Sequence, residues 1–98
     1  MKCLIVDDDP LICDLLEHFC SKIDDINGVT TAMSGFETVS QINGSMFDLI
    51  ILDFNLPDLT GKEILNIVEP STAVIMVTSQ KDFASDSYAY DNIVDYLV

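Results

Sequence analysis

Residues 48–61 have the sequence DLIILDFNLPDLTG, and this stretch decides the fold. Four consecutive apolar residues, 49–52, are followed by the single acid Asp53 and by a loop that Pro57 and Gly61 interrupt. A short apolar run of this kind is typical of a strand buried on both faces of a parallel sheet. Asp53 is therefore predicted at the carboxyl end of an inner strand.

A second apolar run, residues 3–6, ends in the same way at the acids Asp7 and Asp8. Ligand sites in open parallel sheets form outside the carboxyl ends of the strands. If the two strands are neighbours, the carboxylates of Asp7, Asp8 and Asp53 meet at one point. Carboxylates that lie so close together require either a bound divalent cation or a raised pKa. A cluster with only oxygen ligands suits Mg2+.

The rest of the chain alternates short apolar runs with helical patterns, which predicts an α/β fold with a parallel sheet. Strands are predicted at residues 2–6, 29–33, 48–53, 73–77 and 96–98. Helices are predicted at residues 10–23, 34–44 and 62–68, with a weaker pattern at 83–90. The strand order 2-1-3-4-5 places the first and third strands side by side, with helices on both faces of the sheet.

Two helix starts have recognisable caps. Asp9 precedes Pro10, a residue that suits the first helical turn. Ser34 is followed three residues later by Glu37, the pattern of a capping box. The residues predicted to face inward from this second helix are Phe36, Val39 and Ile42.

Bulk composition narrows the function. The chain has 98 residues, which is one domain at most, and 49% of them are hydrophobic, which is ample for a core. The net charge of −13 argues against nucleic acid or an anionic membrane as a direct partner. No stretch is long enough to span a membrane, and no signal peptide is recognisable, so a cytoplasmic location is expected.

The three cysteines, Cys3, Cys13 and Cys20, match no metal or redox spacing and are predicted to be buried or partly buried free thiols.

The predicted strand ends favour phosphoryl transfer. The fourth strand ends at Thr78, on the same edge as the acids. Carboxylates and a hydroxyl around a cation fit a reaction that needs mainly positioning and charge stabilisation. Asp53, alone at its strand end, is the candidate nucleophile, with Asp7 and Asp8 holding the metal and Thr78 donating a hydrogen bond to the phosphoryl group. Each residue alone also has a structural explanation, such as capping a helix, so the argument depends on their joint pattern.

With these motifs, the chain resembles the receiver domain of a two-component response regulator over its whole length. The matching stretches are residues 3–10, 48–61, 74–79 and 94–98. The resemblance implies that Asp53 is the phosphoacceptor and a sensor histidine kinase its donor. It also implies a Mg2+ site with Asp8 as direct ligand, Asp7 as an adjacent or water-mediated one, and the backbone carbonyl of Asn55 as another.

The resemblance extends to residues that control the signal. It implies that Thr78 moves toward the phosphoryl group and that Tyr96 is the aromatic switch residue. Asn55 and Gln80 match positions that tune how long the phosphoryl group lasts. Residues 15–17, 88–91 and 93–97 resemble receivers that precede a LytTR-type DNA-binding domain, which would bind DNA separately.

One departure from the family pattern concerns the end of the chain. Receivers have a lysine directly after the fifth strand and a fifth helix beyond it, whereas this sequence ends at Val98. Neither Lys62 nor Lys81 matches that position. Residues 1–98 are therefore expected to form a receiver domain that is incomplete at its carboxyl end. An uncovered sheet face near the first helix would follow, and it would favour dimerisation or aggregation.

A signalling domain of this kind is not expected to be an enzyme in the usual sense. Two other classes of protein are alternatives to it. An aspartate-nucleophile phosphatase usually has a second acid two residues after the nucleophile, where this chain has Asn55. A phosphorylation-independent receiver would act as a dimerisation module, with the face of the fourth helix and fifth strand as its contact. A dinucleotide-binding module is excluded, because no Gly-x-Gly-x-x-Gly follows the first strand.

Overall fold

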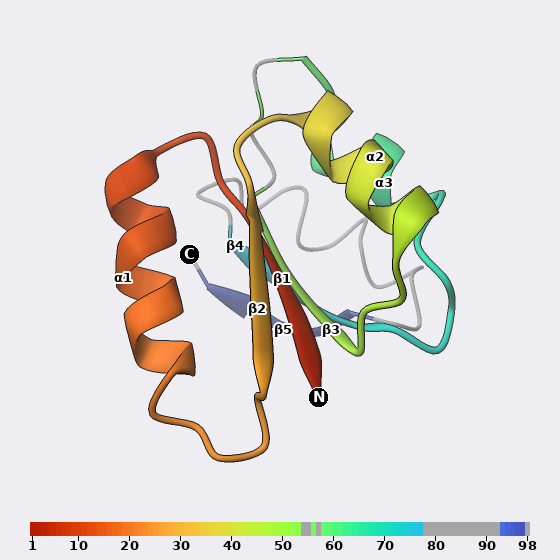
Figure 1. Cartoon of the computed structure of the whole chain (residues 1–98). Helices are drawn as coiled ribbons and strands as arrows, with labels where there is room; N and C mark the ends of the chain where they lie inside the picture. The colour runs from red at the N-terminus through yellow and green to blue at the C-terminus, as the bar shows by residue number, and fades with distance from the viewer. Residues whose placement is uncertain (54–55, 57, 78–92, 98) are drawn as a thin grey trace.

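The computed structural model describes residues 1–53, 56, 58–77 and 93–97, the last segment by its backbone alone. The elements in chain order are β1 (Lys2–Val6), α1 (Pro10–Cys20), β2 (Gly28–Ala32), α2 (Gly35–Gly44), β3 (Leu49–Asp53), α3 (Gly61–Leu65), β4 (Ala73–Val77) and β5 (Ile93–Leu97), as Figure 1 shows.

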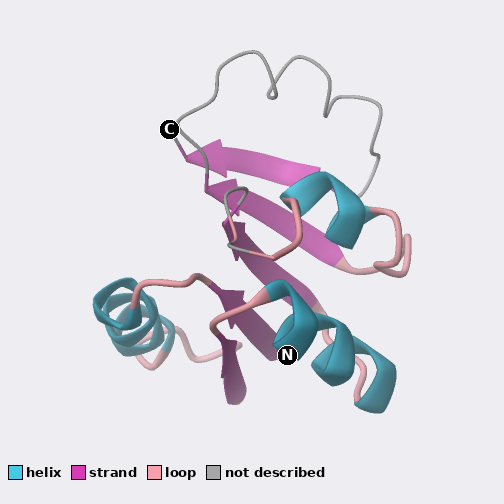
Figure 2. Cartoon of the chain, turned by 90° about the horizontal axis from the view of Figure 1, so that it is seen from above, coloured by secondary structure: helices cyan, strands magenta, loops and turns pink. Residues whose placement is uncertain are grey.

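All five strands form one parallel sheet in the order β2-β1-β3-β4-β5, which confirms the predicted topology. Helix α1 lies on one face of this sheet, and α2 and α3 lie on the other (Figure 2). Strand β1 is flanked by β2 and β3, so its carboxyl end lies directly beside that of β3. The sheet therefore supplies the edge at which the predicted acids were expected to meet.

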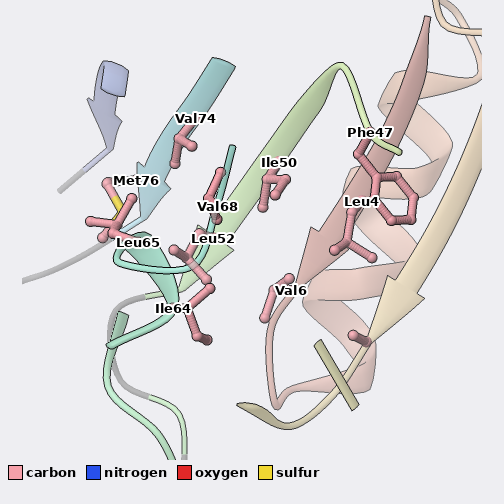
Figure 3. Close-up of a cluster of buried hydrophobic side chains, with 11 residues drawn as sticks. Leu4, Val6, Phe47, Ile50, Leu52, Ile64, Leu65, Val68, Val74 and Met76 are labelled. Atoms are coloured by element: carbon pink, nitrogen blue, oxygen red, sulfur yellow. The ribbon is translucent and has the colours of Figure 1, made fainter. Parts of the chain in front are cut away.

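The apolar runs fill a core on both faces of the sheet. Alternate strand residues face α2 and α3, where side chains from β1, β3, β4 and α3 meet (Figure 3). The residues between them, such as Cys3, Ile5 and Ile51, form a second cluster against α1. This burial on both faces is why the runs lack polar alternation. On the α1 face, Ile75 and Val77 remain half-buried, and α1 is the only described helix there.

Several predicted boundaries were wrong. Strand β2 begins one residue early, at Gly28, and β3 begins at Leu49 rather than residue 48. Helix α1 ends at Cys20 instead of residue 23, because the chain turns at residues 21–22. Strand β5 covers Ile93–Leu97 and thus starts before the predicted residue 96. The helix predicted at residues 83–90 lies outside the described residues.

Helix α3 is Gly61–Leu65 rather than 62–68, because a cap absent from the prediction starts it early. Thr60 Oγ1 accepts a hydrogen bond from Glu63 N at 3.2 Å, and the Glu63 carboxylate accepts one from Thr60 N at 3.5 Å, which completes a capping box. At α2, Ser34 caps the helix as predicted, but Glu37 accepts from Met33 N instead of closing the box on Ser34.

The predicted inward face of α2 was wrong at Phe36, which is 79% exposed. The buried residues of this helix are Gly35 and Thr38. Thr38 tolerates burial because its hydroxyl donates a hydrogen bond to the carbonyl oxygen of Ser34 at 2.7 Å. An apolar pattern therefore identified this helix, whereas local hydrogen bonding decided which side faces the sheet.

The three cysteines are buried free thiols, as predicted. Burial, the nearby Cys20 and its side-chain hydrogen bond raise the pKa of Cys3 to about 12, so its thiolate is disfavoured at physiological pH. Among the described helices, none combines the length and apolar character that crossing a bilayer requires.

Candidate functional site

The acids of the two central strands meet at the carboxyl edge of the sheet. Val6 of β1 pairs with Leu52 of β3, so the residues that follow them, Asp7 and Asp53, are neighbours across the strands. Asp8 completes the cluster: one carboxylate oxygen from each of the three acids lies within 4.8 Å of the others. The meeting predicted from the sequence is therefore present in the structure.

Asp7 is the most firmly held of the three acids. Its side chain is buried, with 6% exposure, and Oδ1 accepts a hydrogen bond from Asp9 N at 2.9 Å. Its backbone N–H donates to the carbonyl oxygen of Ala32 at 3.1 Å, and its own carbonyl accepts from Cys13 Sγ at 3.3 Å. Strand β2 and helix α1 thus fix Asp7 from two sides.

The other two acids open the cluster to solvent, because Asp8 is exposed and Asp53 is half-buried. The next acid, Asp9, caps helix α1, as predicted. Its Oδ1 accepts a hydrogen bond from Leu11 N at 2.9 Å. The chain therefore turns away from the sheet just after Asp8, and α1 begins at Pro10.

The electrostatics of the cluster favour a cation. Burial is the largest effect on Asp7 and raises the pKa of its carboxyl above the ordinary value of 3.8, while the hydrogen bond from Asp9 N lowers it. The charges of Asp8 and Asp9 raise the pKa further. The three carboxylates, one of which is costly to ionise, form a set of oxygen ligands that suits a hard divalent cation such as Mg2+.

We expect Asp7→Asn to stabilise the cation-free protein at pH 7, because the neutral amide avoids the cost of burying a charge and the repulsion by Asp8 and Asp9. One such repulsion is worth about 1 kcal/mol between charges about 4 Å apart in water. Because the pKa of Asp7 is raised, the stability from its protonated form is fully present below the unfolded-state pKa and is lost as the pH rises through the folded-state pKa. The gain should therefore vanish below about pH 3.8. Urea unfolding followed by circular dichroism, with chelator present, measures it.

Asp24→Asn is the matched control for this variant, since Asp24 is exposed and lies outside the cluster but loses the same charge. Adding Mg2+ should stabilise the wild-type protein and the control, and it should stabilise Asp7→Asn less. Equal stabilisation of all three proteins by Mg2+ would contradict a cation site that includes Asp7.

The other site residues predicted from the sequence are Asn55, Thr78, Gln80 and Tyr96. Asn55, Thr78 and Gln80 lie outside the described residues. For Tyr96, the backbone pairs with Met76 across β4 and β5, while its side chain lies outside the described part of the chain.

Sequence reasoning missed one set of contacts between the β3–α3 connection and the start of α2. Asp58, in the connection between β3 and α3, accepts hydrogen bonds from the backbone N–H groups of Gly35 and Phe36 at 2.7 and 2.9 Å. An acid after a proline is a recognisable turn signal. Its partners are more than twenty positions away in the sequence, however, so only the fold brings them together.

Comparison with known families and proteins gives a consistent result. The sequence profile described as "Response regulator receiver domain" matches residues 3–98. A sensory transduction protein LytR of Staphylococcus epidermidis is 34% identical over 101 residues, covering 100% of this chain and 40% of that protein. An uncharacterized response regulatory protein of Vibrio vulnificus is 30% identical over 100 residues, covering 100% of this chain and 41% of that protein. The chain thus spans about two-fifths of the length of these relatives.

Solved structures resemble this fold closely. The response regulator protein TrrA of Thermotoga maritima, in complex with Mg2+-BeF, has a TM-score of 0.80 and 27% identity, covering 99% of this chain and 84% of that one. A CheY-like response regulator receiver domain protein of Methanospirillum hungatei has a TM-score of 0.85 and 28% identity, covering 98% and 78%.

Proposed function

Because the chain belongs to the family of response regulator receiver domains, we propose that Asp53 accepts a phosphoryl group in a Mg2+-dependent reaction. The observation that carries the proposal is the approach of the Asp7, Asp8 and Asp53 carboxylates to within 4.8 Å at the carboxyl edge of the sheet. In the transfer, a carboxylate oxygen of Asp53 bonds to phosphorus while the bond from phosphorus to the donor breaks, leaving an acyl phosphate.

The remaining acids would hold the metal. Asp8, which is exposed, would be a direct ligand, and the buried Asp7 would act beside it or through water, with Asp53 and the carbonyl of Asn55 as further ligands. When bound, Mg2+ supplies neutralisation of the charge on the phosphoryl oxygens. Burial, together with the charges of Asp8 and Asp9, raises the pKa of Asp7, and a bound cation would favour its ionised form.

The donor and the response follow from the family. A sensor histidine kinase would phosphorylate Asp53, and the added charge would shift the population of two receiver conformations. Thr78 and Tyr96 would carry that shift, and Asn55 and Gln80 would tune the lifetime of the phosphoryl group. The chain would therefore act as a signalling domain, and its face around β5 is the candidate contact for a second copy.

The role of the whole protein is a further part of the proposal. The similarity to LytR proteins, one of which is named a transcriptional regulatory protein, supports an effector domain that binds DNA outside this chain. The net charge of −13 makes direct DNA binding by this chain unfavourable. A cytoplasmic location would suit both the kinase and the DNA target.

Incubation with acetyl phosphate, read by intact mass, tests the function. We expect one phosphoryl group to be added in the presence of Mg2+ and none when a chelator removes the cation. Circular dichroism on the same samples establishes that the protein is folded. Absence of the adduct from folded protein that binds Mg2+ would contradict the proposal and favour a phosphorylation-independent dimerisation module.

A further inference from the structure

A pocket of about 300 Å³ opens on the α2 and α3 face of the sheet, at the edge opposite the acidic cluster. Its walls come from the end of α2, the connection from α2 to β3, the start of β3 and the connection from α3 to β4. It therefore lies where β3 and β4 begin, whereas Asp53 lies where β3 ends. A volume of this size is at the lower end of the range for sites that bind small molecules.

Hydrogen bonds hold the two connections that form the pocket. The buried Thr72 donates from Oγ1 to the carbonyl oxygen of Phe47 at 2.9 Å, which ties one connection to the other. Its backbone N–H donates to the carbonyl oxygen of Glu69 at 2.9 Å. At the end of α2, Ser45 N donates to the carbonyl oxygen of Gln41 at 3.0 Å. The walls are thus held before any ligand binds, so a ligand would lose little affinity to ordering of the protein.

The pocket has an apolar floor and an exposed apolar rim. The buried side chains of Phe47, Ile50 and Val68 form the floor and belong to the core cluster beneath α2 and α3 (Figure 3). On the rim, Met46 is 79% exposed and Ile67 is 46% exposed. These two side chains leave apolar surface in water, and an apolar ligand would cover it. The lining therefore favours a ligand with an apolar body.

The charges around the pocket favour a cation. Glu69 is an exposed acid in the lining. The last turn of α2, residues 41–44, has the sequence QING, so it offers no basic side chain to the negative end of the helix dipole. The Phe47 ring already attracts one ammonium group, since Lys2 Nζ lies 5.4 Å from its centroid. The net charge of −13, in which Lys2 is already counted, adds a field that attracts cations.

We propose that this pocket binds a small organic cation, in which an ammonium group is attached to an apolar body such as a phenyl ring or a short alkyl chain. The apolar body would lie on Phe47, Ile50 and Val68, and the ammonium group would lie toward Glu69 and the end of α2. The proposal does not depend on phosphorylation of Asp53, because the two sites lie at opposite edges of the sheet.

Three probes with the same phenyl body test the class of ligand. At neutral pH, phenethylamine carries a positive charge, phenethyl alcohol carries none, and hydrocinnamate carries a negative charge. We expect phenethylamine to bind with a Kd of about 1 mM or below, measured by titration followed through backbone amide chemical shifts, with the largest changes in the pocket lining. Phenethyl alcohol should bind about fivefold more weakly, the effect of one pair of charges in water, and hydrocinnamate more weakly still.

Glu69→Gln tests the contact with the cation, with Glu17→Gln as the matched control. Both substitutions remove the charge of an exposed glutamate, but Glu17 belongs to α1, on the other face of the sheet. Glu69→Gln should weaken binding of phenethylamine about fivefold and leave that of phenethyl alcohol unchanged. Glu17→Gln should change neither Kd by more than about twofold. Ile67→Ala tests the apolar contact and should weaken both probes alike, by about threefold.

The outcomes distinguish this site from other kinds of binding. Equal Kd values for phenethylamine and phenethyl alcohol would overturn the cation preference. Folded protein whose chemical shifts do not respond to phenethylamine would overturn the site itself. Changes that appear instead at Leu11, Leu15 and Phe19, three exposed apolar residues of α1, would also overturn it, because the probe would then follow exposed apolar surface in general.

Concentration of the protein without any probe is the last control. If the pocket amides shift under that condition alone, a second copy of the chain fills the pocket, and the assignment to a small cation is wrong. Should Ile67→Ala not fold, Glu69→Gln still decides, because it changes an exposed side chain. Phosphorylation of Asp53 is tested separately with acetyl phosphate, so either proposal can fail without the other.

Discussion

Asp53→Asn is expected to abolish the phosphoryl adduct formed with acetyl phosphate and Mg2+. The amide has nearly the shape of the carboxylate but lacks the anionic oxygen that attacks phosphorus and forms the acyl phosphate. Asp7 and Asp8 remain in place, yet Asp7 is buried and its Oδ1 already accepts the N–H of Asp9. Incorporation should therefore fall below detection by intact mass, although circular dichroism should show an unchanged fold.

Asp24→Asn is the control for this variant as well, since it removes one negative charge at an exposed site outside the cluster. It should be phosphorylated to the same extent as wild type. If Asp53→Asn were still phosphorylated to the wild-type level, the acceptor would be another residue. Mapping the modified peptide would then show whether Asp8 or a residue away from the cluster carries the group.

The fold was largely predictable because inner parallel strands have a distinctive pattern. The runs at residues 3–6 and 49–52 are apolar without interruption, since both faces of the sheet are covered there. Element ends were less predictable. The start of α3 depends on Thr60 and Glu63 closing a capping box, whereas the prediction treated residue 60 as part of a loop. Patterns of hydrophobicity do not specify such local hydrogen bonds.

The helix faces show a second limit. Helix α1 buries Cys13 and Cys20, while the side chains of Leu11 and Phe19 on the same helix are 76% and 54% exposed. Apolar residues occupy more than one side of this helix, so their spacing does not identify the side that packs on the sheet.

For the site, the sequence predicted which residues meet but not how they are supported. Strand ends and sheet order were enough to bring Asp7, Asp8 and Asp53 together, because register follows from pairing between neighbouring strands. The hydrogen bonds that Asp58 accepts from Gly35 and Phe36 depend instead on where α2 begins relative to the β3–α3 connection. That distance is a property of the folded chain, and no local pattern contains it.

Leu52→Ala is expected to lower the free energy of unfolding by about 3–4 kcal/mol, the largest stability effect proposed for this chain. Leu52 is fully buried in β3, and it pairs with Val6 on one side and Met76 on the other. Both neighbours belong to the same core cluster (Figure 3). Truncation removes apolar contacts and leaves a cavity between three strands whose backbones are held by the sheet, so little collapse can compensate. Urea unfolding followed by circular dichroism measures the loss.

Leu15→Ala is the matched control, because Leu15 is 48% exposed on α1 and its truncation should cost less than about 1 kcal/mol. A domain of this size has a total stability of about 5–15 kcal/mol, so Leu52→Ala should remain folded at low temperature. Since Leu52 belongs to the core cluster and Asp53 is unchanged, the folded variant should still accept a phosphoryl group. A loss of less than about 1 kcal/mol would contradict the tight core described for β3. Loss of phosphorylation in folded protein would instead mean that packing of the residue before Asp53 sets the geometry of the acceptor.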